Sequence, residues 1–132
     1  MKTRIASCSC GGLNVTCTGE PIRISMCHCH ACQRRTGSVF AVQVRFPRER
    51  VVVEGETRTY ERVGDEGSKA TFRFCPSCGA TVFWENDSMP DNVAVAVGAF
   101  ADATIPPPTV SVYDVRRHPW TEMPALASAK IM

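Results

Sequence analysis

The sequence predicts a mainly β fold built from small antiparallel sheets and pinned by clustered cysteines. Short segments that alternate apolar and polar residues recur along the chain, separated by glycine and proline turns, and none has the period of a long amphipathic helix. Seven of the eight cysteines fall into short-spaced groups. With 132 residues, 44% hydrophobic and 21% charged, the composition is that of a globular protein with one core. We therefore expect a single domain over residues 1–132.

Charge and hydropathy exclude several classes of protein. The formal net charge of +2 is too small to indicate a nucleic-acid partner by itself. No apolar run approaches the roughly 20 residues of a membrane helix. The basic start of the chain has no apolar segment after it and does not match a signal peptide. We expect a cytoplasmic protein with no membrane partner, whose thiols stay reduced.

Three strands and one helical turn are expected in the first third of the chain. Each strand pattern alternates, or is rich in β-branched and aromatic residues, and each is bounded by glycine or proline. Strands are expected over residues 13–18, 22–27 and 39–46. Residues 31–35 predict a helical turn that ends at Gly37.

The rest of the chain continues the same pattern. Residues 51–53 and 57–60 flank Glu54-Gly55-Glu56 and predict a β-hairpin. In the knuckle Cys75-Pro76-Ser77-Cys78-Gly79, proline fixes one φ and glycine tolerates a positive φ, which lets backbone N–H groups turn toward sulfur. Further strands are expected over residues 71–74, 81–85, 93–100 and 110–115, and residues 121–132 are expected to be irregular or to form a short helix.

The cysteine spacings favour metal binding over disulfides. The groups are Cys8-x-Cys10, Cys27-x-Cys29-x-x-Cys32 and Cys75-x-x-Cys78, and such short spacings are those of metal ligands. Thiolates this close repel one another unless a cation lies among them, and in proteins the usual cation is Zn²⁺. A disulfide framework would require an exported protein, for which the sequence has no signal.

The two outer groups together predict a structural zinc site. Cys75 and Cys78 form a half-site whose partners are either Cys8 and Cys10 or two cysteines of the central group. The second choice leaves a central thiol and the N-terminal pair without a role. A site made of Cys8, Cys10, Cys75 and Cys78 uses both outer groups, and four thiolates make its ion a poor Lewis acid that holds the fold.

The central group then predicts a second, open zinc on Cys27, Cys29 and Cys32. If residues 27–30 are extended, side chains alternate, so the cysteines converge while His28 and His30 face the other way. Three protein ligands leave one position open, as in catalytic zinc sites. Three thiolates suit an exchangeable thiol or a small carbonyl better than peptide hydrolysis.

Outside the three cysteine groups, few residues are candidates for metal or substrate binding. Cys17 alternates in phase with the apolar residues of its strand and is expected to be an ordinary buried thiol, and His118 is expected to be a surface or packing residue. Arg34 and Arg35 could bind substrate carboxylates, because arginine pairs with them through two hydrogen bonds, or they could be a solvated pair. Phe40, Phe83 and Trp84 are expected in the core. No general acid or base is identified.

The chain resembles the glutathione-dependent formaldehyde-activating (GFA) family, also called the CENP-V/GFA domain family. The matching stretches are Cys8-Ser9-Cys10-Gly11, the segment from Cys27 to Ser38, Phe74-Cys75-Pro76-Ser77-Cys78-Gly79, and the tail Arg117-His118-Pro119-Trp120. The resemblance implies a Mss4-like fold and the same two zinc sites. It also implies a carbon–sulfur lyase, namely an S-hydroxymethylglutathione synthase that joins formaldehyde to glutathione. Ser111 stands where many members carry a histidine, which bears on whether glutathione is the thiol.

Three functions compete at this point. The first is a zinc-dependent carbon–sulfur lyase or synthase acting on a thiol and a small aldehyde. The second is a non-catalytic, zinc-stabilised module that binds protein or nucleic acid through arginines interspersed with acids. The third is a redox or metal-buffering thiol site, in which the second zinc would be loosely held and its site only partly occupied. Oligomeric state is left open, including a homo-oligomer.

Overall fold

The fold was analysed in a computed structural model, which describes residues 1–122 and 130–132. Helix α1 spans His30–Thr36, and short 3-10 turns span Arg48–Arg50, Val97–Phe100 and Asp114–Arg116. No helix in the described part of the chain is long and apolar enough to cross a membrane. The strands are β1 (Thr3–Ser7), β2 (Asn14–Thr18), β3 (Arg23–Cys27), β4 (Ala41–Pro47), β5 (Val51–Glu54), β6 (Arg58–Val63), β7 (Lys69–Phe74), β8 (Thr81–Asn86), β9 (Met89–Ala96), β10 (Val110–Val112) and β11 (Lys130–Ile131).

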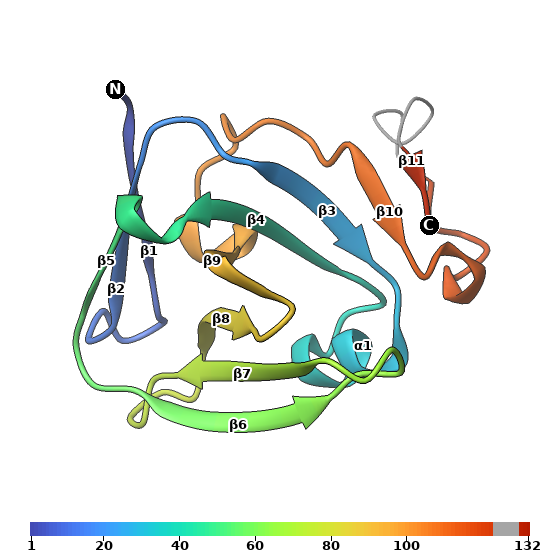
Figure 1. Ribbon diagram of the computed structural model, residues 1–132, viewed down its shortest axis with the longest axis horizontal. Helices are drawn as coiled ribbons and strands as arrows, with labels where there is room; N and C mark the ends of the chain where they lie inside the picture. The colour runs from blue at the N-terminus through green and yellow to red at the C-terminus, as the bar shows by residue number, and fades with distance from the viewer. Residues whose placement is uncertain (123–129) are drawn as a thin grey trace.

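The strands form two sheets, so the prediction of a mainly β protein is confirmed. One sheet has three strands in the order β1-β2-β5, and the other has eight in the order β11-β10-β3-β4-β9-β8-β7-β6. The larger sheet curls, with β3 and β4 along one side and β6 and β7 along the other (Figure 1). Small antiparallel sheets were expected, but this sheet is large and mixed, because β10 runs parallel to both β3 and β11.

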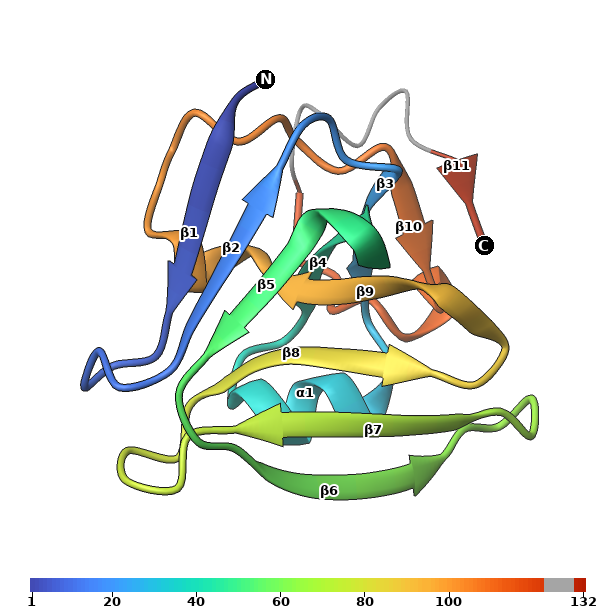
Figure 2. The same ribbon diagram turned by 60° about the vertical axis from the view of Figure 1, so that its left-hand side comes forward.

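The predicted hairpin over residues 51–60 is wrong. Strand β5 pairs with β2 in the smaller sheet, whereas β6 pairs with β7 in the larger one. Between them Gly55 has a φ of +110°, and a Cβ placed there would overlap the carbonyl oxygen of Gly12. The glycine therefore allows the chain to pass close to Gly12 as it leaves β5, and the connection then runs on to β6 in the other sheet (Figure 2).

Most other elements lie where the sequence predicts them. Gly37 ends α1 with a φ of +72° and donates its N–H to the carbonyl of Gln33. The strand expected over residues 93–100 ends at Ala96, and the one expected over 110–115 ends before Tyr113, whose φ is +52°. Strand β1 was not among the expected elements. Of the terminal segment, residues 130–131 form β11, and residues 123–129 lie outside the described part.

Period-two alternation gives the larger sheet two different faces. On one face Ile24, Val44 and Val95 are in register and pack with Leu13 and Val15 of the smaller sheet in one buried cluster. The other face carries a different set in register: Arg23, Arg45, Ala94, Trp84 and Phe72. The first face is the core between the sheets, and the second is available for a site.

Candidate functional site

The four outer cysteines meet at one point. Their Sγ atoms lie within 4.8 Å of one another, with Cys8 and Cys75 buried and Cys10 and Cys78 exposed. The Sγ of Cys10 is 3.6 Å from those of Cys8 and Cys75. In a tetrahedral zinc site with Zn–S bonds of about 2.3 Å, sulfurs lie roughly 3.8 Å apart. This cluster therefore has the dimensions of a four-thiolate zinc site.

Backbone N–H groups support these sulfurs. The N–H of Leu13 donates to the Sγ of Cys8 over 3.2 Å, and that of Ser77 donates to Cys75 over 3.4 Å. Gly79 takes a φ of +78° and closes the knuckle by donating to the carbonyl of Cys75. Backbone hydrogen bonds, chiefly from Ala80, lower the pKa of Cys78 to about 6. These N–H groups stabilise the thiolate forms of Cys8, Cys75 and Cys78, and the thiolate is the form that binds a metal.

The three central cysteines form a second cluster, beside α1. Cys27 ends β3, Cys29 is the N-cap of α1, and Cys32 lies in the first turn. All three are buried, with Sγ atoms within 4.8 Å of one another. Within the described residues, this group contains no fourth protein ligand. A tetrahedral zinc held here would therefore keep one position for another molecule.

The protonation state of the three central cysteines would differ with and without a bound cation. Hydrogen bonds from Cys27 and Cys32 lower the pKa of Cys29 to about 2, although burial opposes its ionisation. The same contact with Cys29, together with burial, raises the pKa of Cys27. The N–H of Cys32 also donates to the Sγ of Cys29 over 3.3 Å. Without a metal the cluster favours one thiolate among thiols, and a divalent cation would favour three.

His28, His118 and Cys17 lie outside both clusters of the described chain, and His30 is exposed at the start of α1. His28 is fully buried near the ring of Phe40, its centroid 6.3 Å away, and burial lowers its pKa. His118 donates from Nε2 to the Oε1 of Gln33 over 2.9 Å. Cys17 is 1% exposed, and burial raises the pKa of its thiol to about 12. These groups are packing residues, and none belongs to a metal-sized cluster of the described chain.

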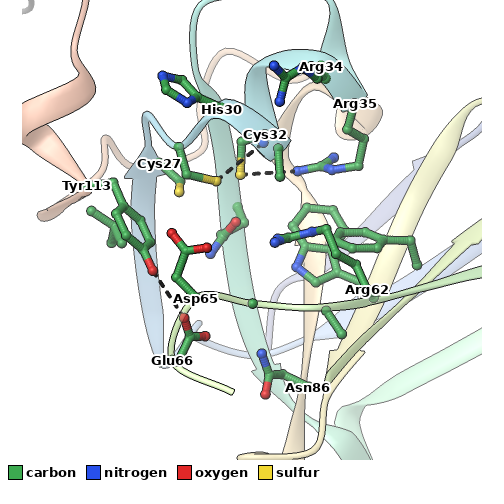
Figure 3. A pocket seen from close by; sticks show the side chains of 18 of the residues that line it. Cys27, His30, Cys32, Arg34, Arg35, Arg62, Asp65, Glu66, Asn86 and Tyr113 are labelled. Carbon is green, nitrogen blue, oxygen red and sulfur yellow. Dashed lines mark hydrogen bonds between the residues drawn. The ribbon is translucent and has the colours of Figure 1, made fainter. Parts of the chain in front are cut away.

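The three-cysteine cluster borders a cavity of about 440 Å³. The cavity lies over the second face of the larger sheet, between that face, α1 and the segments around residues 64–66 and 112–116. Figure 3 shows Cys27 and Cys32 at one end of it and Glu66 and Asn86 at the other. Its charged lining is mostly basic, with six arginines and two acids: Arg23, Arg34, Arg35, Arg45, Arg62, Arg116, Asp65 and Glu66.

The two arginines predicted to bind substrate both line this cavity. The guanidinium of Arg35 lies over Trp84, 4.3 Å from the ring centroid, and its Nη2 is 4.0 Å from the Sγ of Cys32 (Figure 3). Arg35 is therefore fixed against the aromatic wall, with its charge beside a sulfur. Arg34 is exposed at the last turn of α1 and has no such partner in the described chain.

Several cavity residues were not predicted from sequence. Trp84, expected only in the core, is buried but also forms cavity wall, because its ring lies on the cavity face of β8. Tyr113 packs against the cysteine cluster, and its hydroxyl donates to Glu66 over 3.1 Å. The alternation of β3, which places Arg23 on the same face as Cys27, is the one sequence signal that could have revealed the basic lining.

Ser111, the position at which the family resemblance implies a histidine, is fully buried. Its hydroxyl donates to Asp114 over 2.7 Å. The cavity lining includes its neighbours Val112 and Tyr113 but not Ser111. In this chain the position stabilises the turn after β10.

Comparisons with known proteins give a family match and one solved structure of similar fold. The family model described as glutathione-dependent formaldehyde-activating enzyme matches residues 3–116. A crystal structure of a Rhodobacter sphaeroides protein, a structural genomics target, shares the fold at a TM-score of 0.56 and 22% identity, covering 78% of this chain and 91% of that one. No curated protein gives a significant match.

Proposed function

We propose, from the premise that this chain belongs to the glutathione-dependent formaldehyde-activating family, that it is a zinc-dependent carbon–sulfur lyase or synthase. Its substrates would be a glutathione-like thiol and a small aldehyde such as formaldehyde. The observation that carries the proposal is the group of three buried cysteines that opens on a basic cavity. The four-cysteine cluster would hold the structural zinc.

The reaction adds a thiolate to a carbonyl. The thiolate sulfur forms a bond to the aldehyde carbon while the C=O π electrons move to oxygen, and one proton then gives the S-hydroxymethyl product. Zinc at the three cysteines would supply positive charge that favours the thiolate form of an exchanging thiol. The product contains all atoms of both substrates, and nothing is oxidised or reduced.

The chain's own residues would bind and orient the substrates. Arg34 supplies an uncommitted positive charge at the mouth, suited to a carboxylate of the thiol. Arg35 fixes the wall beside Cys32. Tyr113 packs against the cysteines and donates its only hydroxyl proton to Glu66, so its phenol oxygen would accept a hydrogen bond from the hydroxyl of the adduct. Trp84 and Phe72 bound the cavity and exclude water.

The arginines do not favour the alternative of a nucleic-acid-binding module. Arg45 is 5% exposed, and Arg48, Arg116 and Arg117 each pair with a carboxylate. Arginines committed in this way do not leave a continuous basic surface, which phosphate binding requires.

The test is isothermal titration of zinc-loaded protein with glutathione. Cys29→Ser removes one ligand of the open site and is expected to weaken binding at least tenfold. Cys17→Ala is the matched control, because it removes a buried thiol outside both clusters, and it should bind as the wild type does. Equal binding by wild type and Cys29→Ser, or binding by neither, would contradict the proposal.

A further inference from the structure

A pair of arginines lies on the cavity face of the larger sheet, at a distance from the three central cysteines. Arg23 on β3 and Arg45 on β4 are directly opposite in the antiparallel register, where Cα atoms are about 5 Å apart. Both line the cavity. Arg45 is 5% exposed, so one of two adjacent like charges is almost fully removed from water.

This pair has no countercharge of its own. Within residues 1–122 and 130–132, neither guanidinium forms a salt bridge. Arg45 donates from Nη1 to the Oδ1 of Asn92 over 3.0 Å, but the Nε atoms of Arg45 and Arg23 are buried without a partner. Burial and the neighbouring Arg23 lower the pKa of Arg45 to about 10. Buried charges left unpaired are strongly destabilising, so such a pair indicates a missing anion.

One polar cavity residue, Gln43, lies between the arginine pair and the cysteines along the sheet. Cys27, Ser25 and Arg23 alternate onto one face of β3. Gln43, opposite Ser25 on the neighbouring strand, lines the cavity, whereas Ser25 is fully buried and is not part of the lining. Arg23 lies four positions before Cys27 on β3, which is a distance of about 13 Å at the usual rise per residue.

We propose that the Arg23–Arg45 pair is an anion subsite for a carboxylate that lies many bonds from the sulfur of the thiol substrate. The inference rests on the proposed function for the position of the sulfur and adds the two residues that would hold the far carboxylate of the thiol. A molecule that reaches both ends is peptide-sized, with a polar group between its thiol and its carboxylate to meet Gln43. A carboxylate between two guanidiniums would satisfy the unpaired donors. Short thiols would reach only the cysteines.

The experiment is isothermal titration of zinc-loaded protein with glutathione, S-methylglutathione and 3-mercaptopropionate. Arg45→Met should weaken both glutathione compounds at least tenfold, and Arg23→Met should act in the same direction. The affinity for 3-mercaptopropionate should change less than twofold. Arg58→Met is the matched control, since Arg58 is an exposed arginine of β6 outside the cavity lining, and it should change none of them.

The outcomes separate the subsite from the zinc chemistry. If both glutathione compounds bind equally and both depend on Arg45, the subsite stands and the proposed sulfur contact fails. If glutathione binding depends on Cys29 but not on Arg45 or Arg23, the subsite is overturned and the proposed function stands. The subsite is also overturned if Arg45→Met weakens the binding of 3-mercaptopropionate as much as it weakens that of glutathione. It is likewise overturned if neither glutathione compound binds to the wild type.

Folding of the variants is checked independently. Replacing a buried arginine by methionine removes an unpaired charge and is expected to preserve the fold. Far-UV circular dichroism tests this, and Arg45→Lys, which keeps the charge but loses the fork of donors, should recover part of the affinity. If Arg45→Met does not fold, Arg23→Met and Arg45→Lys decide the outcome, because Arg23 is only partly buried.

Discussion

Glu85 binds two arginines at once. Its Oε1 accepts from the Nε of Arg73 and its Oε2 pairs with the Nη2 of Arg48, each over 2.7 Å. Burial opposes its ionisation, but the hydrogen bonds from Arg73 and Arg48 outweigh burial and hold its pKa below the usual range. This carboxylate ties the turn after β4 to strands β7 and β8.

The pH dependence of stability follows from this shift. Because the pKa of Glu85 is lower in the folded than in the unfolded chain, its contribution is present above the unfolded pKa of about 4.3 and is lost as the pH falls through the folded pKa. We expect Glu85→Gln to lower the free energy of unfolding by about 1 kcal/mol at pH 7, and the difference to shrink toward pH 3.

Urea unfolding at both pH values measures this difference. Glu61→Gln is the control, because Glu61 is 56% exposed and pairs only with Lys69 at 3.2 Å, so less than about 0.5 kcal/mol is expected. A Glu85→Gln effect that is the same at pH 7 and pH 3 would argue against an ionic contribution.

Arg34 and Arg35 differ in their contacts and in their exposure to solvent. They are adjacent in a short helix, so their side chains point in different directions around its axis. Arg35 lies over Trp84 and reaches Cys32, while Arg34 remains exposed. From the sequence both arginines have the same predicted role. The tertiary contacts fix Arg35 in the cavity wall and leave Arg34 as an exposed charge.

At the scale of elements, the four-cysteine cluster joins segments that no strand pairing connects. Cys8 and Cys10 lie in the turn between β1 and β2, and Cys75 and Cys78 lie in the turn between β7 and β8. These turns belong to different sheets. A metal bound there would act as a cross-link between sheets, while the three-cysteine cluster spans only the end of β3 and the start of α1.

This difference predicts unequal effects of ligand substitution on stability. Cys78→Ser and Cys32→Ser should each reduce the zinc content, measured by mass spectrometry, from two ions to one per chain. Loss of the cross-link in Cys78→Ser should lower the melting temperature by roughly 10 °C, about 3 kcal/mol or more. Cys32→Ser should lower it far less. A larger loss of stability in Cys32→Ser would assign the structural role to the other cluster.

At the scale of the whole molecule, the two sheets share one core. Ala6, Leu13 and Val15 of the smaller sheet are 0% exposed and belong to the same buried cluster as Val44 and Phe46 of the larger sheet. Neither sheet can keep its inner face covered without the other. The expectation of one domain over residues 1–132 therefore becomes a prediction about cooperativity.

We expect a single unfolding transition, coincident by far-UV circular dichroism and tryptophan fluorescence. Leu13→Ala should lower the free energy of unfolding by about 2–5 kcal/mol and shift both signals together, because it leaves a cavity in the shared core. Val52→Ala, on the outer face of β5 at 57% exposure, should cost less than about 1 kcal/mol. Two separate transitions would show that the sheets unfold independently.

The sequence determined the features whose signals are local. Cysteine spacing and the turns around each knuckle pointed to the grouping of seven sulfurs, because a metal site needs several ligands from short loops. Alternation predicted most strands, since side chains in a strand change face at every residue. The end of α1 followed from Gly37, whose left-handed conformation is favourable for glycine.

Only the tertiary structure decided which strands pair and what lines the cavity. Residues 51–60 have the pattern of a hairpin, but the pairing of β5 with β2 and the close approach of Gly55 to Gly12 outweighed the local turn signal. The meeting of Arg23 with Arg45, and of Tyr113 with Glu66, depends on register and on contacts between residues distant in the chain. No local pattern encodes those contacts, because they exist only once the sheet has formed.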